Sequence, residues 1–142
     1  MKIYFDSSFL VSLYSPDANS TAAMATIQTS FGDRLLTTLA EIEVINALEL
    51  RIFRKEATSV QAHSSLIDFE RDLSHSFFQL RGLSDPIFER ARQISRQTTA
   101  KLGTRTSDLL HVAAALEFGV DYLYSFDQSQ RRLAQTVRLK VN

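Results

Sequence analysis

The stretch that decides the fold class of this chain is KIYFDSS, residues 2–8. Its first part, Lys2–Phe5, places three hydrophobic residues in a row instead of alternating them with polar ones. Such a run is typical of a strand that is buried on both faces, as strands of parallel sheets are. Asp6 follows directly, and the sequence after it predicts a helix over Ser7–Tyr14 that Pro16 ends. A buried strand that passes straight into a helix indicates an α/β protein.

The alternation of short strands and helices continues along the chain. The further predicted strands are Arg34–Thr37, Ser76–Leu80, Asp121–Ser125 and Arg138–Val141. The further predicted helices are Ala18–Phe31, Leu39–Lys55, Ser59–Leu73, Ile87–Lys101, Ser107–Phe118 and Gln128–Gln135. We therefore expect one α/β domain over residues 1–142, with a central parallel sheet of about four to five short strands flanked by helices.

Composition excludes several classes of protein. The chain has no cysteine, which rules out a disulfide scaffold, a thiolate zinc site and a cysteine nucleophile. No apolar run approaches the ~18–20 residues of a membrane span, and Asp6 interrupts the apolar N-terminal stretch where a signal peptide would need its core. A cytoplasmic protein without membrane association is expected. The 16 basic and 16 acidic residues balance, which argues against bulk electrostatic binding to nucleic acid but leaves room for a local basic rim.

Two of the predicted strands end in an aspartate. Asp6 follows the first strand, and Asp127 follows the strand that begins at Asp121. Open α/β sheets bind ligands at the carboxyl ends of their strands, so both side chains are candidates for a site. Each could instead do no more than cap the helix that follows, since aspartate is a favoured N-cap residue.

A third aspartate, Asp108, lies in the first turn of a helix that is apolar nearly all round and is therefore predicted to be buried. The helix dipole favours an anion at this position, which is a complete structural explanation of Asp108 when it is taken alone. His111 lies three residues on and shares its helical face. A single histidine there is more often a hydrogen-bonded core residue than a ligand.

The fourth candidate is Glu43. Thr38 and Glu41 fit a capping box, so Glu41 has a sufficient local role. Glu43 and Asn46 have no such role, and at 100° per residue they interrupt a stripe of apolar residues, which are Leu39, Ile42, Leu50 and Phe53. A buried, unpaired carboxylate would cost several kcal/mol, so we expect either an arginine or a metal ion beside Glu43.

The four stretches that hold these residues resemble, in order and spacing, the PIN-domain family and within it the VapC-type toxin ribonucleases. They are Ile3–Ser8, Thr38–Val44, Arg105–Ala115 and Leu123–Asp127. The resemblance implies a PIN-like α/β fold and a cognate antitoxin that blocks the site, and usually a homodimer. It also implies an acidic site made of Asp6, Glu43, Asp108 and Asp127, with hydroxyl groups nearby on Ser7 and Ser125.

Carboxylates that converge in one crevice repel each other and need a cation to be stable at neutral pH. Oxygen ligands select Mg²⁺ or Mn²⁺, and the lack of a histidine pair at zinc-ligand spacing argues against zinc. The first hypothesis is therefore a Mg²⁺- or Mn²⁺-dependent endoribonuclease acting on RNA. Asp6 and Asp108 would hold the metal, and Glu43 and Asp127 would complete its shell or orient water. Hydrogen bonds to the site or to phosphate are assigned to Ser7, Asn46 and Ser125. The candidates for contacts to the RNA backbone are Arg51, Arg54, Arg105, Arg131 and Arg132.

Two other hypotheses stay open at this point. In one, the chain is a non-catalytic interaction module whose acidic crevice binds a basic partner peptide through arginine–carboxylate pairs. In the other, Asp6 is the nucleophile of a phosphatase, a reaction that would call for a second aspartate where Ser8 stands. Mn²⁺ binding and RNA cleavage by the purified protein would separate the first two hypotheses.

Overall fold

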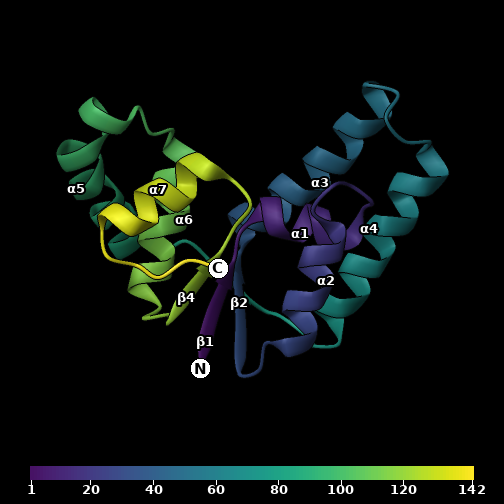
Figure 1. Ribbon diagram of the computed structural model, residues 1–142, viewed down its shortest axis with the longest axis horizontal. Helices are drawn as coiled ribbons and strands as arrows, with labels where there is room; N and C mark the ends of the chain where they lie inside the picture. Colours follow the sequence, from purple (N-terminus) through teal and green to yellow (C-terminus); the bar gives the residue numbers. More distant parts are fainter.

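The computed structural model describes all residues, 1–142, and is built on one parallel sheet (Figure 1). The sheet has four strands in the order β3-β2-β1-β4. The strands are β1 (Lys2–Phe5), β2 (Asp33–Thr37), β3 (Gln79–Arg81) and β4 (Tyr122–Tyr124). The helices are α1 (Ser7–Tyr14), α2 (Ser20–Thr29), α3 (Thr38–Phe53), α4 (Ser59–Ser74), α5 (Asp85–Leu102), α6 (Thr106–Glu117) and α7 (Gln128–Thr136).

Strand β1 is central, and its register with both neighbours fixes the edge at which the site forms. Ile3 pairs with Arg34 of β2 on one side and with Tyr122 of β4 on the other. All pairings in the sheet are parallel, so the carboxyl ends of the strands meet at one edge. The residues that directly follow β1, β2 and β4 therefore lie at that edge.

The two faces of the sheet carry separate hydrophobic cores, since successive side chains of a strand point to opposite faces. Tyr4 packs in a core with α5, α6 and α7, whereas Ile3 and Phe5 pack in a core with α1 to α4. Figure 1 shows the result: α5, α6 and α7 gather on one side of β1, and the long pair α3 and α4 on the other. The strands point up into the space between these two groups of helices.

The predicted α/β class with a parallel sheet flanked by helices is confirmed, and most predicted elements match the observed ones to within a few residues. The predicted last strand, Arg138–Val141, is wrong as a strand. It forms only one isolated parallel bridge, between Val141 and Leu123 of β4. No helix of the chain combines the length and the hydropathy needed to cross a membrane.

Two predictions about α3 are also wrong. The N-cap is Thr37, whose hydroxyl accepts a hydrogen bond from Ala40 N, and not Thr38. The apolar stripe is not the buried face either, because Ile42 is 56% exposed and Phe53 is 82% exposed. The residues of α3 that do face the core are Ala40, Val44 and Leu48. These residues pack in the core with side chains of α1 and α4, and the predicted stripe lies outside that core.

Candidate active site

Asp6 and Asp127 both cap helices at the carboxyl edge of the sheet. Asp6 Oδ1 accepts a hydrogen bond from Phe9 N at 2.9 Å, which starts α1 directly after β1. Asp127 Oδ1 accepts one from Gln130 N at 3.1 Å and starts α7 shortly after β4. The capping role considered for each aspartate is therefore real. It also fixes both carboxylates at the ends of neighbouring strands.

The carboxylate of Asp6 is 1% exposed and is held by four hydrogen bonds. Besides Phe9 N, Oδ1 accepts from Ser8 Oγ at 2.7 Å, and Oδ2 accepts from Ser125 Oγ at 2.5 Å and Gln130 Nε2 at 2.8 Å. Burial raises the pKa of Asp6. The charge of His111 and the hydrogen bonds from Ser125, Phe9 and Ser8 lower it, but by less than burial raises it. No lysine or arginine forms an ion pair with Asp6.

Ser8 and Gln130 also belong to the site, although neither was among the residues predicted from the sequence. Ser8 follows Asp6 by two residues, so its place in the first turn of α1 could have indicated contact with the capping carboxylate. Gln130 lies in the first turn of α7, and its backbone bonds to Asp127 while its side chain bonds to Asp6. Ser125 joins the same two aspartates, since it donates to Asp6 and accepts from Asp127 N at 3.0 Å. These contacts tie the two strand ends together.

Arg105 links Asp127 to Asp108. Its Nε and Nη2 atoms each lie 3.2 Å from an oxygen of Asp108, and Nη2 also lies 2.8 Å from Asp127 Oδ2. Asp108 is buried, with 2% exposure, and its Oδ2 also accepts a hydrogen bond from Arg105 N at 3.3 Å. The pKa of Arg105 is raised, first by the hydrogen bond to Asp108 and the charge of Asp108, and then by the hydrogen bond to Asp127 and the charge of Asp127.

Glu43 pairs with the imidazole of His111 and not with an arginine. Glu43 Oε1 lies within hydrogen-bonding distance of His111 Nε2. His111 Nδ1 lies 2.7 Å from the Tyr4 hydroxyl, which in turn lies 2.9 Å from Thr37 Oγ1. Burial raises the pKa of Tyr4, so the phenol keeps its proton. His111 is thus a hydrogen-bonded core residue, and through it Glu43 is joined to the central strand.

The side chains at this edge offer the oxygen atoms that a divalent cation prefers, although these atoms do not converge on a single position in this arrangement. No three histidine, cysteine, aspartate or glutamate side chains are grouped so that they could hold a metal ion in this arrangement. The chemistry of the donors fits Mg²⁺ or Mn²⁺ all the same, because the groups at the edge are carboxylate oxygens. Asp6 is a buried carboxylate without a cationic partner, and Asp108 and Asp127 already share one cation, the guanidinium of Arg105.

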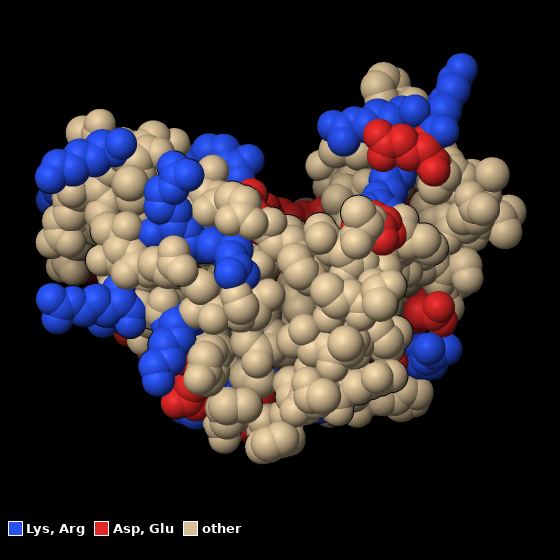
Figure 2. All heavy atoms as spheres, in the orientation of Figure 1, with Lys and Arg blue, Asp and Glu red and all other residues tan.

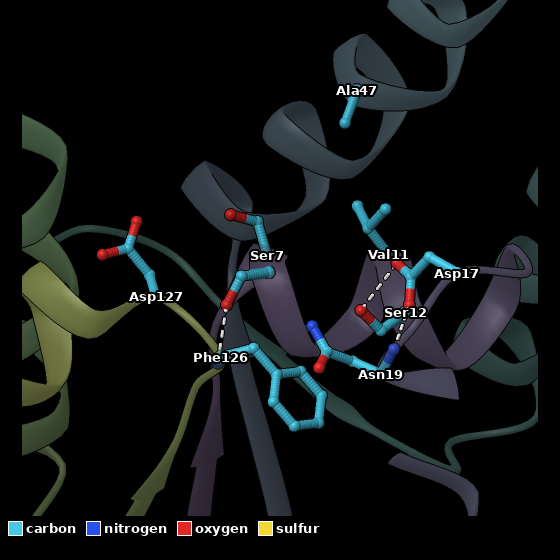
Figure 3. Close-up of a pocket in the computed structure, with 9 residues that line it drawn as sticks. Ser7, Val11, Ser12, Asp17, Asn19, Ala47, Phe126 and Asp127 are labelled. Atoms are coloured by element: carbon cyan, nitrogen blue, oxygen red, sulfur yellow. Dashed lines mark hydrogen bonds between the residues drawn. The ribbon is translucent and has the colours of Figure 1, made fainter. Parts of the chain in front are cut away.

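A groove of about 380 Å³ opens beside the carboxylates (Figure 3). It is lined by Ser7, Ser8, Val11, Ser12, Asp17, Asn19, Ala47, Phe126 and Asp127. In Figure 3 Ala47 approaches it from the helix above, and Asp127 and Phe126 border it on the side of the β4–α7 loop. Figure 2 shows the molecule hollowed between its two groups of helices, with acidic atoms in the hollow and basic side chains on the surface at both sides of it.

The remaining predicted residues fall into two groups. Arg51 is held by Asp17 at 3.1 Å, and Arg131 by the carbonyl of Ser125 at 3.1 Å, so both guanidinium groups have partners within the chain. Arg54, Arg132 and Asn46 have exposed side chains that contact none of the four carboxylates.

A sequence model of the PIN domain matches residues 3–135, which is nearly the whole chain. The chain belongs to the PIN domain family. This confirms the family resemblance of the four sequence stretches. No curated protein sequence matches this PIN domain significantly.

Solved structures share its fold at low sequence identity. VapC20 of Mycobacterium tuberculosis, described as a sarcin–ricin loop cleaving toxin, superposes with a TM-score of 0.72 at 14% identity, covering 92% of this chain and 93% of that one. FitAcB of Neisseria gonorrhoeae superposes with a TM-score of 0.70 at 16% sequence identity, covering 98% of this chain and 95% of that one. VapBC2 of Rickettsia felis, bound to a DNA fragment from its promoter, superposes with a TM-score of 0.66 at 14% sequence identity. The match covers 100% of this chain and 98% of that one. These likenesses extend over the whole PIN domain.

Proposed function

We propose that this PIN domain is a divalent-metal-dependent endoribonuclease, which hydrolyses RNA phosphodiester bonds as the toxin of a VapC-type toxin–antitoxin pair. The observation that carries the proposal is Asp6. It is a fully buried carboxylate without a cationic partner, at the carboxyl end of the central strand, and Ser125 and Gln130 tie it to Asp127. Buried carboxylates with perturbed pKa values cluster at functional sites.

Mg²⁺ or Mn²⁺, when bound, would neutralise the carboxylates, bind a phosphate oxygen and lower the pKa of the attacking water. Asp6 and Asp108 are the residues proposed to hold it, with Glu43 and Asp127 completing the site or orienting water. Asp6 is oriented for this by its hydrogen bonds to Ser8 and Ser125. Attack of water on phosphorus with the 3′-oxygen as the leaving group would give a 5′-phosphate and a 3′-hydroxyl, and no cyclic phosphate would form because the RNA 2′-hydroxyl takes no part.

The orientation of Glu43 supports a role near the reacting phosphate. His111 fixes the side chain from the interior, and Tyr4 fixes His111, so the carboxylate need not lose conformational freedom when RNA binds. Ser7 lies at the groove and could donate to a phosphate oxygen. Arg54 and Arg132, with exposed side chains, remain candidates for the RNA backbone.

The partners follow from the same proposal. Structures similar to this one include VapBC2 of Rickettsia felis and FitAcB of Neisseria gonorrhoeae, and we extend from them the proposal of a cognate antitoxin. A homodimer and a cytoplasmic location belong to the proposal as well. An antitoxin that inserts a basic segment would meet the acidic floor of the hollow (Figure 2).

Removal of the metal tests the proposal directly. The purified, partner-free chain is expected to cut RNA in the presence of Mn²⁺ or Mg²⁺, to stop in EDTA, and to resume when Mn²⁺ is added back. Asp108→Asn should remain inactive at every Mn²⁺ concentration. End-group analysis should find 5′-phosphates. Cleavage that persists in EDTA, or that yields cyclic phosphates, would contradict the metal-dependent mechanism.

The groove offers a test of where the RNA lies. Ala47→Trp places an indole in it from α3, one helical turn beyond Glu43. If the groove holds a nucleotide next to the scissile bond, KM should rise about tenfold while kcat changes little. Ala25→Trp, on an exposed position of α2, serves as the control. Equal KM values for the two variants would show that RNA does not use the groove.

The second candidate function is the non-catalytic interaction module. The contact of Arg105 with Asp108 and Asp127 favours it, because the same carboxylates could accept an arginine from a peptide. The two functions differ in one measurement. A pure interaction module would bind a basic peptide but would leave RNA intact at any Mn²⁺ concentration.

A further inference from the structure

We infer that Arg105 is an internal competitor of the divalent cation: its guanidinium occupies the place between Asp108 and Asp127, and metal binding requires it to leave. The inference rests on the proposed function, since it concerns the cation of that same site. It goes beyond it by assigning to Arg105 a role in setting metal affinity, in addition to its candidacy for contacts to RNA.

The contacts of Arg105 are those of a cation shared between two ligands. Nη2 reaches both Asp108 Oδ1 at 3.2 Å and Asp127 Oδ2 at 2.8 Å, and Nε reaches Asp108 Oδ2 at 3.2 Å. Asp108 is buried, so its charge has to be balanced by some cation when no metal is bound. Arg105 provides that balance, and it uses the oxygen atoms that a metal ion would need.

Arg105 can also leave at little cost. Its side chain is 64% exposed, and the other partner of its guanidinium, Asp127, is itself partly exposed. The pair with Asp127 is open to solvent at both ends and is therefore weak, because water solvates the separated charges. In the pair with Asp108 the carboxylate is buried, and the incoming divalent cation would balance its charge. Arg51 differs, since its side chain is only 18% exposed and bonds to Ser15, Asp17 and the carbonyl of Pro16. Arg51 thus lies between α1 and α3, whereas the side chain of Arg105 lies at the surface, where it has room to move once its two partners bind another cation.

Asp108 keeps its orientation when the guanidinium departs. Its Oδ2 atom accepts a hydrogen bond from Arg105 N, and this backbone contact does not depend on the side chain. The carboxylate sits in the first turn of α6, where the helix dipole favours its negative charge. One residue thus holds Asp108 in place through its backbone and competes for it through its side chain.

Mn²⁺ affinity, measured by calorimetry in the absence of RNA, tests the inference. Arg105→Gln is expected to bind Mn²⁺ about tenfold more tightly than the wild type, because the competing cation is gone. Arg132→Gln removes the same charge from α7 without touching a carboxylate and should change the affinity less than about twofold. Arg105→Lys keeps the positive charge but loses the planar guanidinium that bonds to two carboxylates at once. Its Mn²⁺ affinity should therefore lie between that of Arg105→Gln and that of the wild type.

A second readout needs no variant. In the metal-free wild type, the Arg105 Nε–H signal in NMR should be protected from exchange by Asp108, and saturation with diamagnetic Mg²⁺ should remove that protection. Equal tightening in Arg105→Gln and Arg132→Gln would overturn the inference, since a general charge effect would then suffice. Retained protection in Mg²⁺ would also overturn it. Absence of Mn²⁺ binding in the wild type and in all variants would instead contradict the proposed function, and the inference with it.

Discussion

Asp6→Asn is expected to lower RNA cleavage by about a thousandfold, equivalent to about 4 kcal/mol of transition-state stabilisation, while the fold is kept. Asparagine has the shape of aspartate and can still accept the hydrogen bond of Phe9 N that starts α1. It lacks the negative charge that a divalent cation needs. Single-turnover cleavage of a labelled RNA measures the loss. Asp85→Asn, at the exposed start of α5, is the control and should cleave normally.

The same variant is expected to gain stability relative to the metal-free wild type as the pH rises. Burial raises the pKa of Asp6 above its ordinary value of 3.8, so the folded state holds the proton more tightly than the unfolded state. For such a group the free energy of unfolding falls as the pH rises through the two pKa values. The substituted asparagine does not titrate, so in EDTA the melting temperature of Asp6→Asn relative to that of the wild type should rise as the pH is raised from below 3.8 to neutral. A difference that does not vary with pH would contradict this account of Asp6.

Phe9→Ala is expected to cost about 3–5 kcal/mol of stability and to lower the melting temperature by roughly 10 °C. Phe9 is fully buried directly beneath the site. Its ring stacks on Phe126, with centroids 5.3 Å apart and planes 7° apart, and also contacts Phe5 at 5.1 Å. Alanine would leave a cavity under α1 that the surrounding rings cannot fill. Chemical denaturation of the metal-free protein measures the loss.

Phe53→Ala is the matched control for this prediction. The side chain is of the same type but lies 82% exposed at the end of α3, so its removal should change the free energy of unfolding by less than about 0.5 kcal/mol. If Phe9→Ala lost as little unfolding free energy as Phe53→Ala, the contacts of the Phe9 ring with Phe5 and Phe126 would not be what holds α1 in place.

The fold could be predicted from the sequence because local signals agreed with burial. The hydrophobic run of Lys2–Phe5 forms β1 with the predicted bounds, since a central strand is buried on both faces. The face of α3 could not be predicted in the same way. Its sequence contains two possible apolar faces, and the one with Ala40, Val44 and Leu48 packs against α1 and α4, a choice that depends on contacts distant in the sequence. Phe53 was therefore left in solvent.

The site could be predicted only in part, and the difference lies in which contacts are local. Asp6 and Asp127 follow strands, a position visible in the sequence. The partner of Glu43 is 68 residues away, and only the fold brings His111 to it. Arg105 is recognisable in the sequence as a basic residue near Asp108, but no pattern along the chain shows that its side chain also reaches Asp127, which is 22 residues away.

The bond between Glu43 and His111 has a consequence for which substitutions the chain can accept. Glu43 belongs to the half of the molecule packed on α1 to α4, whereas His111 lies on α6 in the other half, among residues such as Val112 and Ala115 that are fully buried. A slightly larger side chain on α6 would shift the imidazole and with it the carboxylate across the sheet. The interior of α6 should therefore show low mutational tolerance, with variants that remain well folded but have already lost catalytic efficiency.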